Sequence, residues 1–183
     1  MISVKDLTKT YGTFKALKGL SFEIDKGEVV GFLGPNGAGK TTTMRVLSCY
    51  MPADSGTVEV AGYDVFHSSL EVKKRVGYLP EVVPLYPEMT VSGYLNYVAQ
   101  IKDIPYNQRS ERLDFVLEAC GLKDRRRQIT GQLSKGYRQR VGLAQSLIHD
   151  PEVIILDEPT SGLDPRQIIE IRELIRELGQ NRT

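Results

Sequence analysis

Eight residues near the start of the chain combine glycines, a lysine and a threonine in a spacing suited to phosphate chemistry. The stretch GPNGAGKT, residues 34–41, fits the pattern G-x-x-x-x-G-K-[ST], between an apolar segment and a helical one. Glycines let successive backbone amides converge on phosphate oxygens, and the following helix presents its unpaired amides to the same anion. The Lys40 ammonium is expected to reach the β- and γ-phosphates, and the Thr41 hydroxyl to ligate Mg²⁺. The expected phosphate-site residues are Gly34, Pro35, Asn36, Gly37, Ala38, Gly39, Lys40, Thr41 and Thr42.

Two acidic residues follow an apolar strand in the second half of the chain. The stretch VIILDEP, residues 153–159, is a continuous apolar run followed by Asp157 and Glu158. We expect Asp157 to hold Mg²⁺ through water, and Glu158 to orient a water molecule aligned with the γ-phosphate or to take its proton. Two acids after a strand are also common in solvated turns. Combined with the glycine loop, they favour a site for triphosphate hydrolysis in which Lys40 and Glu158 are catalytic.

The elements that position these residues alternate between strand and helix patterns. Strands are expected over residues 2–11, 16–25, 28–34, 56–65, 75–80 and 153–159. Residues 28–34 read as a buried strand that runs into the glycine loop, and residues 40–50 as a helix that stops before Pro52. The apolar run that starts at residue 153 is typical of a parallel sheet covered on both faces. The pattern predicts an α/β protein.

A helical segment interrupts this pattern between residues 87 and 133. Thr90 is expected to cap the first of its helices, and Ser134 lies at the start of the helix that follows the segment. One face of the helix near residues 112–121 combines Leu113, Val116, Leu117 and Cys120. Asp164 and Pro165 are expected to start the last helix. The core face of that helix combines Ile168, Ile171, Ile175 and Leu178.

Several ordered motifs resemble the ATP-binding subunit of an ABC transporter over essentially the whole chain. GPNGAGKTT resembles the Walker A loop of that family, VIILDEP its Walker B strand, SGLD (residues 161–164) its D-loop, and LSKGYRQR (residues 133–140) its signature. The KGYRQR run and the GYLPE segment are most like the ABC-2 type exporters. The resemblance implies a P-loop NTPase of ABC-type architecture, with a mixed sheet core, an N-terminal antiparallel β subdomain and a helical subdomain. It implies one domain over residues 1–183, in which 1–86 and 134–183 form the core and β subdomain and 87–133 the helical subdomain.

The family resemblance also implies roles for residues outside the glycine loop. In this family two subunits close head to tail over two ATP molecules. Ser134 and the Gly136 amide are therefore expected to bind the γ-phosphate held by the other subunit, in a homodimer or a heterodimer. Tyr11 matches the aromatic that stacks on adenine, and Asp164 belongs to the D-loop. Glu81 occupies the Q-loop position, where it is expected to reach Mg²⁺ and a separate transmembrane permease subunit.

The sequence departs from the family pattern at three of these positions. Lys135 replaces the first glycine of the usual LSGGQ signature, and Tyr137 stands where glutamine is usual. Lys135 is open to two interpretations: added positive charge near the phosphates, or a side chain in solvent. Glu81 stands where the family more often has glutamine, which adds a negative charge near the metal.

The composition and net charge of the chain argue against nucleic acid as a partner. The 183 residues are 40% hydrophobic and 26% charged with a net charge of +1, so no strong field draws the chain to nucleic acid. Arg125, Arg126 and Arg127 are interpreted as a solvated face, and no nucleic acid is expected. No apolar run approaches the roughly 18 residues of a membrane span. The expected location is the cytoplasm, peripheral to the inner face of the membrane through the permease.

The expected function is nucleotide-driven dimer closure that energises transport, with ATP and Mg²⁺ as ligands. One alternative is a soluble ABC ATPase that acts on ribosomes or DNA, and another is a module that holds nucleotide as a structural ligand. The chain stops before the switch histidine of the family, and His67 and His149 lie outside any such context. We therefore expect a truncated subunit that binds Mg-ATP, hydrolyses it weakly, and exposes a sheet edge or apolar patch.

Overall fold

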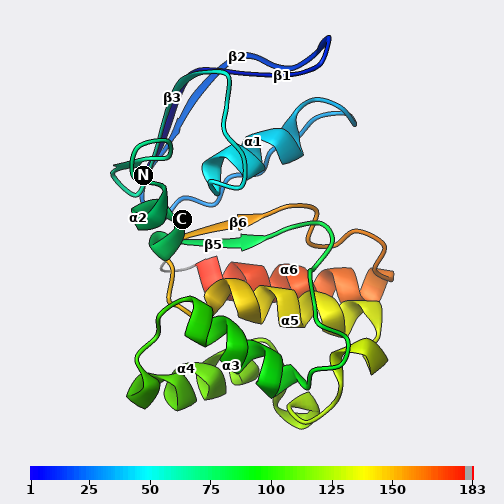
Figure 1. Cartoon of the computed structure of the whole chain (residues 1–183). Coiled ribbons are helices and arrows are strands. Elements are labelled where there is room, and N and C mark those ends of the chain that lie inside the picture. The colour runs from blue at the N-terminus through cyan, green and yellow to red at the C-terminus, as the bar shows by residue number, and fades with distance from the viewer. Residues whose placement is uncertain (180–182) are drawn as a thin grey trace.

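The strands of the described residues form two sheets. The computed structural model describes residues 1–179 and 183. The antiparallel sheet has the order β2 (Phe14–Ile24), β1 (Ile2–Tyr11), β3 (Ser55–Val60) and β4 (Tyr63–Asp64), and the parallel sheet pairs β5 (Val76–Leu79) with β6 (Val153–Leu156). Figure 1 shows the antiparallel sheet at the top of the view, the parallel pair in the middle and most of the helices below it.

Six α-helices and two short 3₁₀ helices complete the described residues. They are α1 (Lys40–Leu47), α2 (Ser69–Arg75), α3 (Val91–Ile101), α4 (Tyr106–Ala119), η1 (Lys123–Arg125), η2 (Thr130–Gln132), α5 (Lys135–Leu147) and α6 (Pro165–Gly179). The expected N-caps are confirmed, because the Thr90 hydroxyl accepts from the Gly93 amide over 3.1 Å and the Ser134 hydroxyl accepts from the Tyr137 amide over 3.5 Å. Helix α2 was not predicted: it has about two turns and a single buried residue, Val72.

One predicted strand is absent. Residues 28–34 pair with no strand among the described residues, and Val29, Val30 and Leu33 are exposed. A cavity of about 360 Å³ lies between this segment and β6, lined by Val29 and Phe32 on one side and by Ile154 and Leu156 on the other. An apolar run becomes a strand only where a neighbouring strand pairs with its amides and carbonyls, and none lies beside this one.

Backbone groups of Thr183 lie along the edge of β6 that faces this cavity. The Ile154 amide donates to the Thr183 carbonyl over 2.7 Å, and the Thr183 amide donates to the Glu152 carbonyl over 3.2 Å. The Gly27 amide donates to the Thr183 hydroxyl over 2.8 Å. Thr183 therefore bridges the end of β6 that is remote from Asp157 and the turn that follows β2.

The parallel pair separates two hydrophobic clusters. Val153 and Ile155 on β6 pack into a cluster with the antiparallel sheet and α1, whereas Ile154 and Leu156 face a cluster with the helices. This alternation follows from the two-residue repeat of a strand. The predicted parallel sheet covered on both faces is confirmed, and both clusters hold β6 in the position from which Asp157 and Glu158 project.

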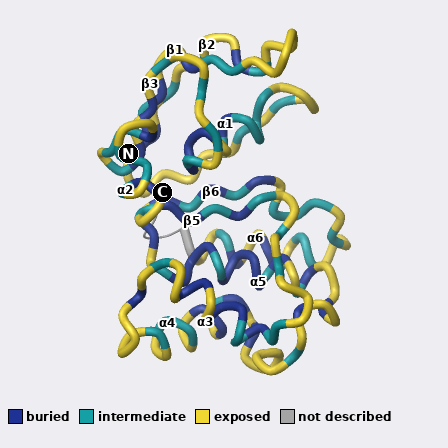
Figure 2. The backbone as a smooth tube through the Cα atoms, in the orientation of Figure 1, coloured by how far each residue is buried: buried dark blue, intermediate teal, exposed yellow. Residues whose placement is uncertain are grey.

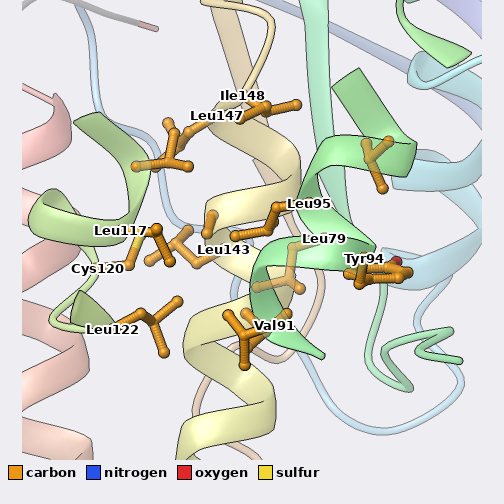
Figure 3. Close-up of a cluster of buried hydrophobic side chains, with 14 of the residues drawn as sticks. Leu79, Val91, Tyr94, Leu95, Leu117, Cys120, Leu122, Leu143, Leu147 and Ile148 are labelled. Atoms are coloured by element: carbon orange, nitrogen blue, oxygen red, sulfur yellow. The ribbon is translucent and has the colours of Figure 1, made fainter. Parts of the chain in front are cut away.

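Helices α3, α4, α5 and α6 enclose the larger cluster. Figure 3 shows Val91 and Leu95 of α3, Leu117 near Cys120, and Leu143 and Leu147 of α5 around a common centre. The predicted faces are confirmed: Val116, Leu117, Cys120 and Ile171 are buried, and Leu113, Ile168 and Ile175 are half-buried. The side chain of Leu178 lies outside the described part of the structure. Figure 2 shows buried positions along β6 and α5 and exposed positions on the outer loops.

Candidate functional site

The glycine loop wraps around a lysine at the start of α1. Gly39 is the N-cap of this helix with φ 92°, and a Cβ at Gly39 would lie 2.6 Å from Leu17 Cδ2 and 2.8 Å from the Ala16 carbonyl oxygen. Only glycine fits this backbone conformation and this close approach to β2. Lys40 Nζ donates to the Gly34 carbonyl over 2.8 Å, so its ammonium lies inside the loop. The unpaired amides at the start of α1 face the same space.

Thr41 and Asp157 form the direct link between the loop and the acidic strand end. The Thr41 hydroxyl donates to Asp157 Oδ1 over 3.0 Å, and Asp157 is 2% exposed. Burial raises the pKa of Asp157, the Thr41 hydrogen bond lowers it, and the negative charges of Glu81 and Glu158 raise it further. A nearby divalent cation would offset this cost of burying a carboxylate.

A cavity of about 560 Å³ opens above these residues and collects the sequence-predicted groups. Its lining includes Tyr11, Asn36, Gly37, Ala38, Gly39, Lys40, Thr41, Thr42, Glu81 and Glu158. These residues come from the end of β1, the glycine loop, the segment after β5 and the turn after β6. The structure thus brings residues from four separate parts of the chain to one cavity. Gly34 and Pro35 lie below it, where both carbonyls accept from the Lys40 ammonium.

Three further residues line this cavity without having been predicted. Phe14 and Ala16 come from the first residues of β2, and Ser161 from the turn after β6. Phe14 is 58% exposed and lies opposite Tyr11 in the β1–β2 register. Its position three residues after Tyr11, across a tight turn at Gly12, was the signal that a hairpin pairs these two aromatic residues across its strands.

Glu158 has an unusual backbone conformation at the rim of the cavity. Its φ is 49°, in the left-handed region that non-glycine residues rarely occupy. The Ser161 amide donates to the Glu158 carbonyl over 3.0 Å, which closes the turn after β6. Such strain costs about 1–3 kcal/mol and is concentrated at functional sites. Here it accompanies an exposed carboxylate at the cavity rim, next to the buried Asp157.

Ser134, Gly136 and Asp164 lie elsewhere, at the starts of α5 and α6. None of the three lines the cavity around Lys40, within the described residues. Asp164 Oδ1 accepts from the Gln167 amide over 2.9 Å, which confirms Asp164 as the cap of α6. Gly136 and Asp164 line a separate cavity of about 340 Å³. Within one copy of the chain, the signature turn (residues 134–136) and the glycine loop therefore do not share a cavity.

The oxygen donors near Lys40 fit a hard divalent cation. Thr41 supplies a hydroxyl, Asp157 a carboxylate and Glu81 a second carboxylate beside the same cavity. Mg²⁺ takes few protein ligands and completes its shell with water and phosphate oxygens. The described residues contain no group of three or more His, Cys, Asp or Glu side chains that could hold a metal ion.

Comparison with known proteins identifies the family. The sequence profile described as "ABC transporter" matches residues 17–161. The chain belongs to the ABC transporter family. The bacitracin transport ATP-binding protein BcrA of Bacillus licheniformis is 41% identical over 182 residues, which cover 100% of this chain and 58% of that protein. The daunorubicin resistance ATP-binding protein DrrA3 of Streptomyces coeruleorubidus is 42% identical over 177 residues, 97% of this chain and 56% of that protein.

Solved structures of ABC proteins confirm the predicted fold class. The cbiO1 protein of Clostridium perfringens, part of the ABC transporter complex cbiONQ, superposes with a TM-score of 0.85 at 29% identity, over 97% of this chain and 73% of that one. The ATP-binding cassette MJ0796, in a dimeric post-hydrolysis state bound to ADP and Pi, superposes with a TM-score of 0.86 at 27% identity, over 98% and 83%. This ABC chain spans 58% of the length of its relative BcrA. Within the described residues, none of its helices has the length and apolar character to cross a bilayer.

Proposed function

We propose that this chain binds and hydrolyses ATP as the nucleotide-binding subunit of an ABC transporter of the drug-exporter type. The observation that carries the proposal is the cavity that joins the glycine loop to Tyr11, Glu81 and Glu158. Family membership and relatives that are named as transport or resistance ATP-binding proteins support it. Substrate binding would use Tyr11 against adenine and the loop amides with Lys40 against the phosphates.

The chemistry follows from the positions of Lys40, Asp157 and Glu158. Thr41 and Asp157 would hold Mg²⁺, which when bound neutralises negative charge on the β- and γ-phosphate oxygens. The exposed Glu158 carboxylate orients a water molecule, accepts its proton as the water oxygen bonds to the γ-phosphorus, and ADP leaves as the bond to the β-phosphate oxygen breaks. Lys40 stabilises the charge that develops on the departing oxygens.

A second copy, or a related subunit, would complete the site. Ser134 is exposed at the start of α5, whereas Gly136 is buried against the Gln167 side chain, and neither residue lines the cavity of its own chain. The Ser134 hydroxyl would meet a phosphate held by a facing subunit, and Gln167 would have to move for the Gly136 amide to do the same. ATP that contacts both subunits binds the closed dimer preferentially and so drives closure. Hydrolysis removes the shared γ-phosphate and reopens the dimer.

The segment after β5 is the proposed docking site for a transmembrane permease. Val82 is 80% exposed and Tyr86 50% exposed, and the Tyr86 and Tyr97 rings meet edge to face at 5.6 Å. Glu81 connects this surface to the nucleotide cavity. We place the chain in the cytoplasm, peripheral to the inner membrane face through this contact. Residues 87–133 form the helical subdomain in this proposal, and 1–86 with 134–183 form the core.

The decisive experiment measures ATP-dependent association in the full-length protein. Glu158→Gln removes the base but keeps the shape, so Mg-ATP should convert the protein to a stable dimer in light scattering. Adding Ser134→Asp should abolish this dimer, because an aspartate still caps α5 but repels the γ-phosphate. Thr90→Asp is the matched control, a cap substitution on α3 that should leave the dimer intact. A Glu158→Gln, Ser134→Asp protein that still dimerises with ATP would refute the shared site.

A further inference from the structure

The side chain of Lys135 lies over the D-loop of its own chain. A Cβ built on Gly162 would lie 2.1 Å from Lys135 Nζ, 3.3 Å from Cε and 3.7 Å from Cδ. Gly162 has φ 64°, so the lysine fills the space that a side chain at this left-handed position would need. Lys135 is an exposed residue whose ammonium lies close to Gly162 and does not line the phosphate cavity of its own chain.

A second side chain, Gln167 of α6, lies against the start of α5 at Gly136. A Cβ built on Gly136 would lie 2.8 Å from Gln167 Cδ and Oε1 and 3.0 Å from Nε2. Gln167 belongs to the first turn of α6, where its amide donates to Asp164 Oδ1. Lys135, from the turn at residues 134–136, therefore lies next to the D-loop. Gln167, from the helix that follows the D-loop, lies next to Gly136 in that turn.

Electrostatics at the start of α5 does not account for a lysine at this position. A cation in the first turn of a helix opposes the helix dipole. Lys135 forms no ion pair in the part of the chain that the structure describes. Instead, the end of its side chain occupies the space next to Gly162 that a Cβ there would take. The contact with the D-loop is the role that the geometry supports.

The D-loop in turn borders the nucleotide cavity. Ser161 lines the cavity around Lys40, and Gly162 follows it directly in the chain. Lys135 follows Ser134, which caps α5 and is proposed to meet the phosphate of the facing subunit. The Lys135 side chain thus links the D-loop, which borders the nucleotide cavity of its own chain, to the turn with Ser134, which is proposed to contact the nucleotide held by the facing subunit.

We infer that Lys135 is a positioning residue that fixes the D-loop against the signature turn and thereby couples the two nucleotide sites of a dimer. The coupling rests on the proposed function, whereas the contact itself does not. Because the ammonium is the group nearest to the space over Gly162, arginine should preserve the link and methionine should weaken it. Gly162→Ala should break it from the other side, since its methyl group would take the place of the ammonium.

Amide hydrogen exchange in the nucleotide-free, full-length protein tests the contact independently of ATP turnover. Lys135→Met and Gly162→Ala should each make the amides of residues 160–164 exchange severalfold faster, and Lys135→Arg should match the wild type. The double variant Lys135→Met, Gly162→Ala should exchange no faster than Gly162→Ala alone, since both changes remove one contact. Unchanged exchange in Lys135→Met would overturn the inference, whatever the fate of the proposed function.

Steady-state ATPase kinetics of the full-length protein test the coupling. Lys135→Met should lower kcat by about tenfold with KM for ATP nearly unchanged, because small misplacement of a catalytic turn costs rate rather than binding. Lys135→Arg should restore kcat. A large rise in KM with kcat retained would mean that Lys135 is a direct phosphate ligand and would overturn the positioning role. Faster exchange in Lys135→Met together with wild-type kcat and KM would support the contact between Lys135 and the D-loop but overturn its role in coupling the two nucleotide sites.

Discussion

The Thr41 hydroxyl donates a hydrogen bond to Asp157 Oδ1 over 3.0 Å, although 116 positions separate the two residues in the chain. Thr41 lies in the first turn of α1 and Asp157 directly after β6. The contact joins the phosphate loop to the acidic strand end and buries the carboxylate almost completely. Two of the three oxygen donors expected for Mg²⁺ are thus in direct contact in the structure.

Removing either oxygen donor should weaken magnesium-dependent nucleotide binding. Asp157→Asn and Thr41→Val should each reduce the affinity for Mg-ATP by about 10- to 100-fold, the usual effect of losing an ordered metal-site group. Isothermal titration with ATP, with magnesium and with EDTA, measures the change. Thr41→Ser is the matched control, because it keeps the hydroxyl. Equal losses with and without magnesium would contradict the metal role.

The raised pKa of Asp157 predicts an acid limit on magnesium-dependent binding. Burial, followed by the charges of Glu81 and Glu158, raises this pKa above the ordinary 3.8 of an aspartate. Protonation therefore begins at a higher pH than for an exposed aspartate, and Mg-ATP affinity should fall as the pH drops through that raised value. Binding titrations between pH 8 and pH 4 measure the midpoint. Glu81→Gln removes one negative neighbour and should move the midpoint to lower pH, and a midpoint that stays in place would argue against this coupling.

Tyr11 should contribute affinity through its ring and not through its hydroxyl. It lines the nucleotide cavity, is 42% exposed, and its hydroxyl donates to Met51 Sδ over 3.1 Å. Tyr11→Ala should weaken ATP binding by roughly 5- to 100-fold, the range for losing one base–aromatic stack, whereas Tyr11→Phe should retain it. Fluorescence titration with a labelled ATP measures both. A loss in Tyr11→Phe equal to that in Tyr11→Ala would assign the effect to the hydroxyl.

His149 should make the fold sensitive to mild acid. Its Nε2 donates to the Val76 carbonyl over 3.0 Å, and the Lys102 ammonium lies 3.3 Å from the same atom. Burial, then the positive charge of Lys102, lowers the pKa of His149 from its ordinary 6.5 to about 4. Arg112 lowers this pKa further, whereas the Val76 hydrogen bond and Asp150 oppose the shift.

The sign of the effect follows from this depressed pKa. The unfolded chain binds a proton near pH 6.5 and the folded chain only near pH 4, so stability present above pH 6.5 is lost as the pH falls toward 4. The loss attributable to His149 is at most about 3 kcal/mol. Urea unfolding from pH 7 to pH 4 measures it. His149→Gln should flatten this profile, and His67→Gln, at the exposed second histidine, should leave it unchanged.

Local sequence determined the phosphate loop and the helix caps. Gly39 and Lys40 specify the loop because positive φ and a terminal ammonium are properties of single residues. Thr90, Ser134 and Asp164 cap their helices through amides three residues along the chain. Each of these features depends on neighbours within one turn, so the residue types were sufficient to predict it.

Only the tertiary structure decided which distant groups meet. Residues 28–34 have the composition of a buried strand, yet they pair with no strand in the described structure, because pairing depends on what lies beside them and not on their own pattern. The placement of Lys135 over Gly162 likewise depends on how separate elements pack. Side-chain chemistry is local, whereas contacts between residues far apart in the chain exist only once the elements have packed together.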